Sequence, residues 1–434
     1  DDTTLVFEAR FESGNLWSAT KVGAFEYDLC ARPDWNTSSY TQWYFFAVGN
    51  TRAGETYKFN FVNMLKDDSL YNYGMMPLAY SVLLNDAEGK GWYRTGRDIC
   101  YYRNRRDYTF TFTFNAAYDM DMMFFAYCYP YTFSQCKIDL KEAELSANGQ
   151  KYMVLVAHAA AAYAIYIYIH IYIYIYSELY HGGQLSSNLA HTTMSFAARC
   201  HPGESNSSWM FKGALNFLLS DDKEAVELRR QFIFLCVPML NPDGVFLGNY
   251  RCSFSGKDLN RQWRAPSKSR CPVVHALKWL VLRHQEKVKN RVFIGTDLHG
   301  HSKKMNVFMY GIEREREREG EGDCVCVRND MFSFARCRFA VSKSKNSTYR
   351  VVLWREVGAK LFCALRITHL VHACDSANWD DAMLRCFSLR RTLGRHQEDL
   401  SCSPRFCRQE YSARTQWKLL LGGRNIAINR VKCK

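Results

Sequence analysis

The stretch Ala197-Ala198-Arg199-Cys200-His201-Pro202-Gly203-Glu204 marks the point at which the sequence pattern changes. After it, residues 205–219 have helical spacing and residues 232–237 form a short apolar run. Residues 273–288 and 292–298 repeat this order of helix and strand. Apolar strands that alternate with helices predict an α/β layer fold, with the functional site at the strand ends.

The first 135 residues have a different pattern. Aromatic and β-branched residues dominate the runs 41–48 and 57–62, and residues 108–114 alternate threonine with aromatic residues. Short runs of this kind, separated by turn signals, are typical of strands. We therefore predict an N-terminal antiparallel β-sandwich domain over residues 1–135.

Two histidines and one glutamate in the downstream half are candidate metal ligands. His201 and Glu204 lie three residues apart, and His299 ends an apolar run in Asp297-Leu298-His299-Gly300-His301. Two imidazoles and one carboxylate can hold zinc and leave its fourth position open for water. Each part alone is weak, because His-x-x-Glu is common and an isolated histidine is more often packed or capping. Together they indicate a hydrolytic zinc site, with His301 as the rival of His299.

Size and composition indicate two or three domains. The chain has 434 residues, of which 47% are hydrophobic, so it can bury a sizeable core.

It has no purely apolar run of 18 residues, and we expect no membrane span. Residues 1–4 lack the features of a signal peptide. The 17 cysteines include no Cys-x-x-Cys pair, so we interpret them as reduced thiols of a cytosolic protein.

The net charge of +14 is unevenly distributed. Residues 331–434 contain 20 Lys and Arg against 7 Asp and Glu, so nearly all of the excess lies in the last quarter of the chain. A charge confined to one segment is poor support for a nucleic-acid partner, and we expect none.

Two segments are simple repeats. Residues 163–176 alternate tyrosine and isoleucine, with one alanine and one histidine, and residues 313–322 alternate glutamate with arginine and then glycine. Translated two-base DNA repeats give both patterns. We interpret the segments as low-complexity insertions from retained non-coding sequence. The alternative is an edge strand for the first, which would be prone to aggregation, and a charged helix or loop for the second.

Ordered blocks along the chain match one known family. They are residues 7–16, 41–45, 127–131, 198–209, 238–244, 248–252, 257–263, 297–304 and 351–356. Together they closely resemble the cytosolic carboxypeptidases, the zinc metallocarboxypeptidases that remove glutamates from tubulin and other proteins. The resemblance implies a carboxypeptidase-type α/β domain with a mixed central sheet over residues 136–356.

The resemblance also implies the activity and its setting. We expect a zinc-dependent hydrolase that removes C-terminal or branch glutamates from glutamate-rich, tubulin-like protein tails. We expect it in the cytoplasm, in association with microtubules or cilia. Oligomeric state is outside what the sequence indicates.

By the same resemblance, individual residues receive roles. His201, Glu204 and His299 would bind one zinc ion, His299 being preferred because the family's ligand is the first histidine of its block. Arg251 would stabilise the oxyanion of the tetrahedral intermediate, where a fixed positive charge opposes developing negative charge. Asn260 and Arg261 would hold the terminal carboxylate of the substrate, which suits the planar fork of arginine.

The family's general base is missing. The family has a glutamate about a dozen residues after the block that ends at Glu356, but Arg366 stands near that place, and no glutamate occurs before Glu398. Residues 357–434 form an unrecognised basic tail, so the α/β domain is expected to be truncated at its C-terminal end. Either the protein is a natural pseudoenzyme or mis-splicing has replaced the true end of the domain. In both cases we expect little or no peptidase activity from the chain as written.

Overall fold

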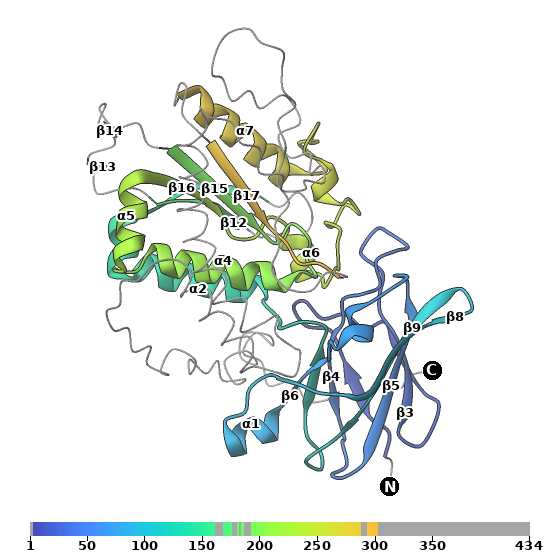
Figure 1. Ribbon diagram of the computed structural model, residues 1–434. Coiled ribbons are helices and arrows are strands. Elements are labelled where there is room, and N and C mark those ends of the chain that lie inside the picture. The colour runs from blue at the N-terminus through green and yellow to red at the C-terminus, as the bar shows by residue number, and fades with distance from the viewer. Residues whose placement is uncertain are drawn as a thin grey trace, which may run out of the picture.

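The computed structural model describes residues 3–160, 168–175, 180–181, 184–185, 192–287 and 293–302. Figure 1 shows an N-terminal part built of two sheets, and a second part in which helices cover a central sheet. The repeat 313–322, the basic tail 357–434 and the position of the missing base lie outside the described residues.

The N-terminal part contains two five-stranded sheets. The first has the order β1 (Val6–Glu8), β4 (Phe45–Gly49), β10 (Met123–Ala126), β6 (Leu78–Ser81) and β7 (Tyr93–Arg94). The second has the order β2 (Ser18–Lys21), β3 (Glu26–Cys30), β5 (Thr56–Met64), β9 (Asp107–Asn115) and β8 (Arg97–Asn104). The short helices η1 (Leu70–Tyr73) and α1 (Val82–Glu88) connect strands.

Aromatic side chains fill the space between these two sheets. The ring centroids of Phe46 and Phe59 lie 5.9 Å apart, and those of Phe114 and Phe125 lie 4.6 Å apart. All four rings are buried, which contributes about 2–3 kcal/mol each. The alternation of residues 108–114 thus places every second side chain in the core.

The strand pairing is not wholly antiparallel, and here the prediction was wrong. β3 and β5 pair in parallel, with Tyr27 opposite Phe59. The chain leaves β3 for β4 in the other sheet and then returns to the second sheet as β5. A connection that crosses between layers brings the next strand back in the same direction, which a hairpin could not do.

The second part has a mixed central sheet with the order β11 (Met153–Ala160), β12 (Tyr168–Ile175), β16 (Phe232–Val237), β15 (Thr192–Ala198) and β17 (Phe293–Leu298). β15 is parallel to both β16 and β17, whereas β12 is antiparallel to β11 and β16. The mixed α/β architecture is therefore confirmed. The remaining elements are α2 (Phe133–Leu145), α3 (Ala147–Tyr152), β13 (Tyr180–His181), β14 (Gln184–Leu185), α4 (Ser205–Leu218), α5 (Lys223–Gln231), α6 (Pro242–Phe246), η2 (Leu259–Arg261) and α7 (Pro272–Lys287).

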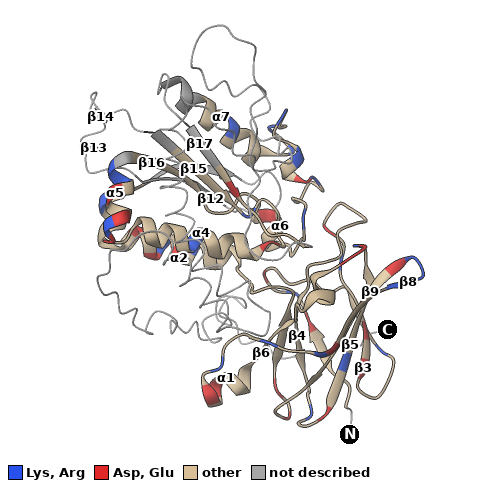
Figure 2. Ribbon diagram, viewed as in Figure 1, with Lys and Arg blue, Asp and Glu red and all other residues tan. Residues whose placement is uncertain are grey.

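Helices cover both faces of this sheet (Figure 1). Ile233, Leu235 and Val237 of β16 belong to the apolar cluster that contains α7. Phe232 and Phe234 belong to the cluster that contains α4. This period of two explains why β16 is apolar throughout: both of its faces are buried. In this second part, Figure 2 shows the coloured charged residues mainly on helices and loops around the sheet.

Two stretches whose sequences are poor indicators of a central strand nevertheless lie at interior positions of the central sheet. Residues 168–175 of the tyrosine–isoleucine repeat form β12, which lies between β11 and β16 and is not an edge strand. β15, whose sequence is only moderately apolar, lies between its parallel neighbours β16 and β17. Within the described ranges, no helix combines the length and apolar character needed to cross a bilayer.

Candidate metal centre

The three candidate ligands emerge from one end of two neighbouring parallel strands. Ala198, the last residue of β15, lies opposite Leu298, the last residue of β17. His201 follows the first strand by three residues and His299 follows the second by one, so both reach the same edge of the sheet. Glu204 stands immediately before α4, which begins at residue 205.

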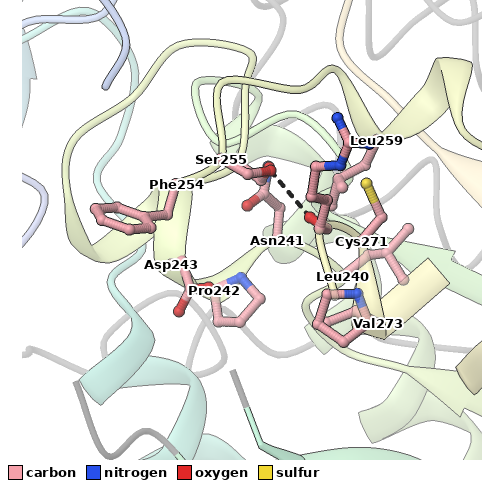
Figure 3. Close-up of a pocket in the computed structure, with 12 residues that line it drawn as sticks. Leu240, Asn241, Pro242, Asp243, Phe254, Ser255, Leu259, Cys271 and Val273 are labelled. Carbon is pink, nitrogen blue, oxygen red and sulfur yellow. Dashed lines mark hydrogen bonds between the residues drawn. The ribbon is translucent and has the colours of Figure 1, made fainter. Parts of the chain in front are cut away.

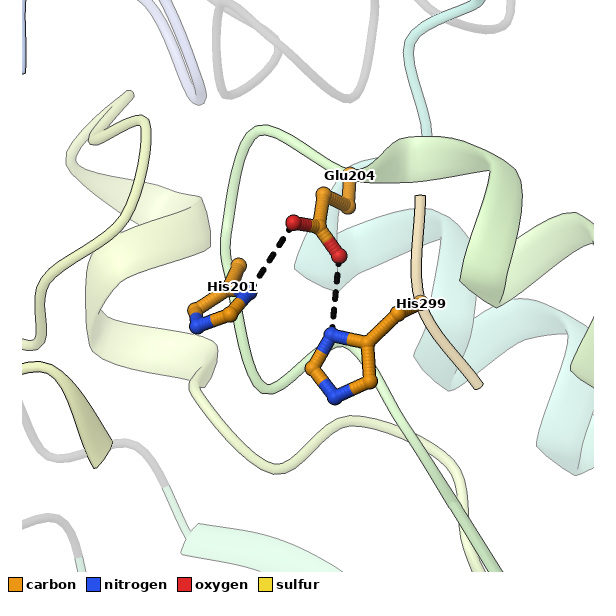
Figure 4. Close-up of side chains that lie close together, drawn as sticks. All are labelled: His201, Glu204 and His299. Atoms are coloured by element: carbon orange, nitrogen blue, oxygen red, sulfur yellow. Dashed lines mark hydrogen bonds and ion pairs between the residues drawn. The ribbon is translucent and has the colours of Figure 1, made fainter. Parts of the chain in front are cut away.

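The carboxylate of Glu204 lies between the two imidazoles (Figure 4). Its Oε1 is 2.9 Å from Nδ1 of His201, and its Oε2 is 2.9 Å from Nδ1 of His299. One ligand atom from each residue lies within 4.8 Å of the others. Ligand atoms that share a tetrahedral zinc ion are roughly 3.4 Å apart, so this group fits the ion with small side-chain adjustments.

Two further carboxylates contact the outer nitrogens of the histidines. Nε2 of His201 lies 3.2 Å from Oδ1 of Asp258, and Nε2 of His299 lies 2.7 Å from Oδ2 of Asp297. Carboxylates that accept from Nε2–H of both imidazoles would leave each Nδ1 available to a metal ion beside Glu204, the arrangement that metal-bound histidines need. The sequence analysis missed both aspartates. The signal for Asp297 was its position two residues before His299, on the same face of an extended chain.

The charges in this group support one another. Burial opposes ionisation of Glu204, but the two imidazoles outweigh it and hold its pKa well below the ordinary range. Burial likewise opposes protonation of His299, but Asp297 and Glu204 outweigh it, and its pKa is raised well above the ordinary value. An environment that stabilises positive charge on the imidazoles also suits a bound cation.

A buried arginine shapes the turn that carries the first two ligands. Arg199 adopts a left-handed conformation with φ of +59°, and its side chain is 1% exposed. Its Nε donates to the carbonyl of Pro202 at 2.7 Å, and its Nη1 donates to Tyr131 O and Ser208 Oγ. A Cβ on Gly203 would lie 2.5 Å from the ring of Tyr250, so only glycine fits between them.

Arg251 joins the centre through Asp258. Its Nε donates to Oδ2 of Asp258 at 2.8 Å, while the other oxygen of that carboxylate faces His201. The His201 imidazole and the Arg251 guanidinium outweigh the effect of burial and lower the pKa of Asp258 to about 2. Arg251, which the sequence analysis assigned to the oxyanion, is therefore connected to the candidate ligand His201 through the single side chain of Asp258.

Asn260 and Arg261 lie on η2, the turn that follows Asp258. The backbone N–H of Asn260 donates to Oδ1 of Asp258 at 2.9 Å, and its side chain accepts a hydrogen bond from Trp263 Nε1 at 3.0 Å. Arg261 is exposed, and its Nη1 donates to the carbonyl of Asn260. The rival ligand His301 is exposed and lies outside the group formed by His201, Glu204 and His299.

A small cavity lies beside the turn that follows β16 (Figure 3). Its walls include the turn from Leu240 to Asp243 and the start of α7. Its volume of about 30 Å³ holds roughly one water molecule, so it is not the substrate site. Asn241 in its wall donates to the carbonyl of Cys200, which links this turn to the residue before His201.

Two family models match the chain. The model described as zinc carboxypeptidase matches residues 139–316, and the one described as cytosolic carboxypeptidase N-terminal domain matches residues 7–128. The chain therefore belongs to the zinc carboxypeptidase family, and within it to the cytosolic carboxypeptidases.

The curated relatives extend over most of the chain. Cytosolic carboxypeptidase 3 of Bos taurus is 41% identical over 362 residues, which are 82% of this chain and 36% of the relative. Cytosolic carboxypeptidase 2 of Xenopus tropicalis is 42% identical over 359 residues, which are 81% of this chain and 37% of the relative. The chain thus spans little more than a third of the length of these relatives.

Solved structures share the fold. A metallo-carboxypeptidase from Burkholderia cenocepacia superimposes with a TM-score of 0.54 at 21% identity, covering 70% of this chain and 72% of that one. The Pseudomonas aeruginosa metallo-carboxypeptidase in complex with (2-guanidinoethylmercapto)succinic acid superimposes with a TM-score of 0.52 at 23% identity. This match covers 68% of this chain and 70% of that one. These likenesses confirm the carboxypeptidase-type α/β fold.

Proposed function

We propose that the centre is that of a zinc-dependent metallocarboxypeptidase that acts on C-terminal or branch glutamates of protein tails such as those of tubulin. The observation that carries the proposal is the position of Glu204 between the Nδ1 atoms of His201 and His299. Arg251 is connected to this group through the carboxylate of Asp258. The resemblance to cytosolic carboxypeptidases supports a cytoplasmic setting with microtubule or cilium association.

Each residue has a physical role in this proposal. A zinc ion held by the three ligands would supply a Lewis acid that polarises the scissile carbonyl and activates water. Asp258 and Asp297 keep the imidazoles oriented, with Nδ1 toward the ligand group. Nε of Arg251 is held by Asp258, and we assign its terminal nitrogens to the oxyanion. Asn260 and Arg261, on the adjoining turn, are assigned to the substrate's terminal carboxylate.

The positively charged side chain of Lys66 lies near the centre and supports the proposal that the substrate is acidic. Nζ of Lys66, from the N-terminal part, donates to Tyr250 Oη and to Ser302 Oγ, each at 2.7 Å. Tyr250 adjoins Arg251, and Ser302 lies three residues after His299. Positive charge at this position favours the approach of a glutamate side chain.

We further propose that turnover by this chain is impaired. No glutamate occurs between Glu356 and Glu398, so the family's general base is absent from its expected place. Loss of a general base typically costs two to four powers of ten in rate, or about 3–5 kcal/mol in the barrier. The second candidate function, a pseudoenzyme that binds acidic tails, rests on this same observation.

The test uses the full chain loaded with zinc and a peptide that ends in several glutamates. Binding is followed by fluorescence anisotropy and glutamate release by mass spectrometry, with Glu204→Gln as the metal-centre control. We expect zinc-dependent binding with release at or below one-hundredth of the rate of a cytosolic carboxypeptidase relative. Release at the relative's rate would show that another group serves as base, and absence of zinc-dependent binding would refute the proposed site.

A further inference from the structure

The loop that carries Arg251 is attached to the N-terminal part at several points. Asn15 Nδ2 donates to the carbonyl of Gly248 at 2.9 Å, and the backbone N–H of Trp35 donates to Asn249 Oδ1 at 3.1 Å. Gly248 has φ of +70°, and a Cβ there would lie 2.4 Å from the carbonyl oxygen of Gly14. The two parts of the molecule therefore meet backbone to backbone beside Arg251.

Asp34 makes the central contact of this interface. Its Oδ1 accepts from the backbone N–H of Tyr250 at 2.5 Å, and its Oδ2 accepts from those of Arg251 at 2.8 Å and Cys252 at 2.6 Å. Three consecutive N–H groups that converge on one carboxylate form an anion nest, which fixes the backbone on both sides of Arg251. Charge-assisted hydrogen bonds of this kind are about twice as strong as neutral ones.

Asp34 is placed to act only through this segment. It is 1% exposed, and both oxygens are occupied by backbone N–H groups, so it cannot contact a substrate. From the segment, contacts continue through the Arg251 guanidinium to Asp258 and then to His201. A change at Asp34 would shift the origin of the Arg251 side chain, and misplacement by about 1 Å can cost a hundredfold in function.

We propose that Asp34, contributed by the N-terminal domain, is a positioning residue that fixes Arg251 at the metal centre. The N-terminal domain thereby completes the oxyanion site of the α/β domain. The inference rests on the proposed role of Arg251 for its functional consequence, but its structural claim can be tested independently of catalysis.

The test compares Asp34→Asn with a matched variant of the same interface. Asp34→Asn keeps the side-chain shape but replaces one acceptor oxygen with an NH2 group that faces backbone donors. Asn36→Gly removes the bond from Asn36 Nδ2 to the carbonyl of Phe254 and suits the left-handed backbone there, where φ is +56°. Both variants of the 434-residue chain, loaded with zinc, are first checked for metal content and melting temperature.

Amide hydrogen exchange is the first readout. We expect residues 250–252 in Asp34→Asn to exchange at least tenfold faster than in the unaltered chain, while β4 and β16 keep their protection. Asn36→Gly should accelerate exchange only near residues 254–256. Unchanged exchange of residues 250–252 in Asp34→Asn would overturn the proposal.

Affinity for a phosphinic peptide that ends in glutamate is the second readout, because this group resembles the tetrahedral intermediate. We expect Arg251→Ala to weaken binding about a hundredfold and Asp34→Asn about tenfold. The double variant should bind no more weakly than Arg251→Ala alone, because Asp34 acts through Arg251. Fully additive losses would overturn the proposal. If the unaltered chain does not bind the phosphinic peptide, the proposed function fails, while the exchange readout still decides whether Asp34 fixes the segment.

Discussion

Asp258 lies 2.8 Å from Nε of Arg251 and at the same time holds the outer nitrogen of His201. One carboxylate thus couples a candidate metal ligand to the candidate oxyanion residue. The backbone N–H of Asn260, two residues further along the chain, also donates to the Asp258 carboxylate. The turn that is assigned to substrate binding therefore belongs to the same network. The position of a single side chain thus links the residues proposed for metal binding, oxyanion stabilisation and substrate binding.

The first prediction concerns this aspartate. Asp258→Asn should lower zinc affinity about 10–100-fold, because the amide no longer fixes the charge and tautomer of His201. Competition with a chromophoric chelator measures the change. Asp221→Asn, at an exposed site, is the control and should leave zinc affinity unaltered. Equal affinities of Asp258→Asn and the unaltered chain would contradict the proposed role.

The second prediction concerns the turn before Glu204. Arg199→Ala should lower the free energy of unfolding by about 3 kcal/mol, because three buried oxygen atoms lose a charged donor. Urea unfolding followed by tryptophan fluorescence gives the value. Arg230→Ala, at an exposed site, should change it by less than about 0.5 kcal/mol. A loss in Arg199→Ala as small as in this control would show that the buried arginine does not hold the turn.

The third prediction is a dependence on pH. Burial raises the pKa of Asp243 from 3.8 to about 6. The folded chain therefore retains this proton up to about pH 6, whereas the unfolded chain loses it near pH 4. Stability relative to Asp243→Asn should accordingly fall as pH rises from 4 to 6, by about 2 kcal/mol. Unfolding of both metal-free proteins at pH 4 and pH 7 tests this, and a difference that is the same at both pH values would contradict it.

The fourth prediction concerns the core of the N-terminal part. Phe125 is 0% exposed, and its ring packs against the rings of Phe59 and Phe114 in the opposite sheet. Phe125→Ala should cost about 3–5 kcal/mol, through lost transfer energy and the cavity left behind. Trp17→Ala, at a side chain that is 71% exposed, is the control and should cost less than about 1 kcal/mol. Similar melting temperatures for the two variants would show that the sheets are not held together by this core.

The elements with strong local patterns were predictable from the sequence. The apolar run 232–237 is β16, and the helices predicted over 205–219 and 273–288 agree with α4 and α7 to within one residue at each end. The parallel pairing of β3 and β5 was not predictable, because strand direction there depends on a crossing to the other sheet. Periodicity carries no information about such long-range connections.

The candidate ligands were predictable from residue type and from their position after apolar runs. The residues that contact and orient the site's side chains were predictable only in part. Asp297 had a local signal, since it lies two residues before His299. Asp34 had none, because nothing in the sequence relates it to residues 250–252, more than 200 positions away. Contacts between domains become visible only in the folded chain.

The most direct test of the account is zinc binding by His299→Ala and His301→Ala. Only His299 lies in the group with His201 and Glu204, whereas His301 is an exposed neighbour. Metal content after dialysis and chelator competition should show one zinc ion per unaltered chain and per His301→Ala chain, and loss of tight binding in His299→Ala. Retention of zinc by His299→Ala together with its loss in His301→Ala would contradict the proposed centre.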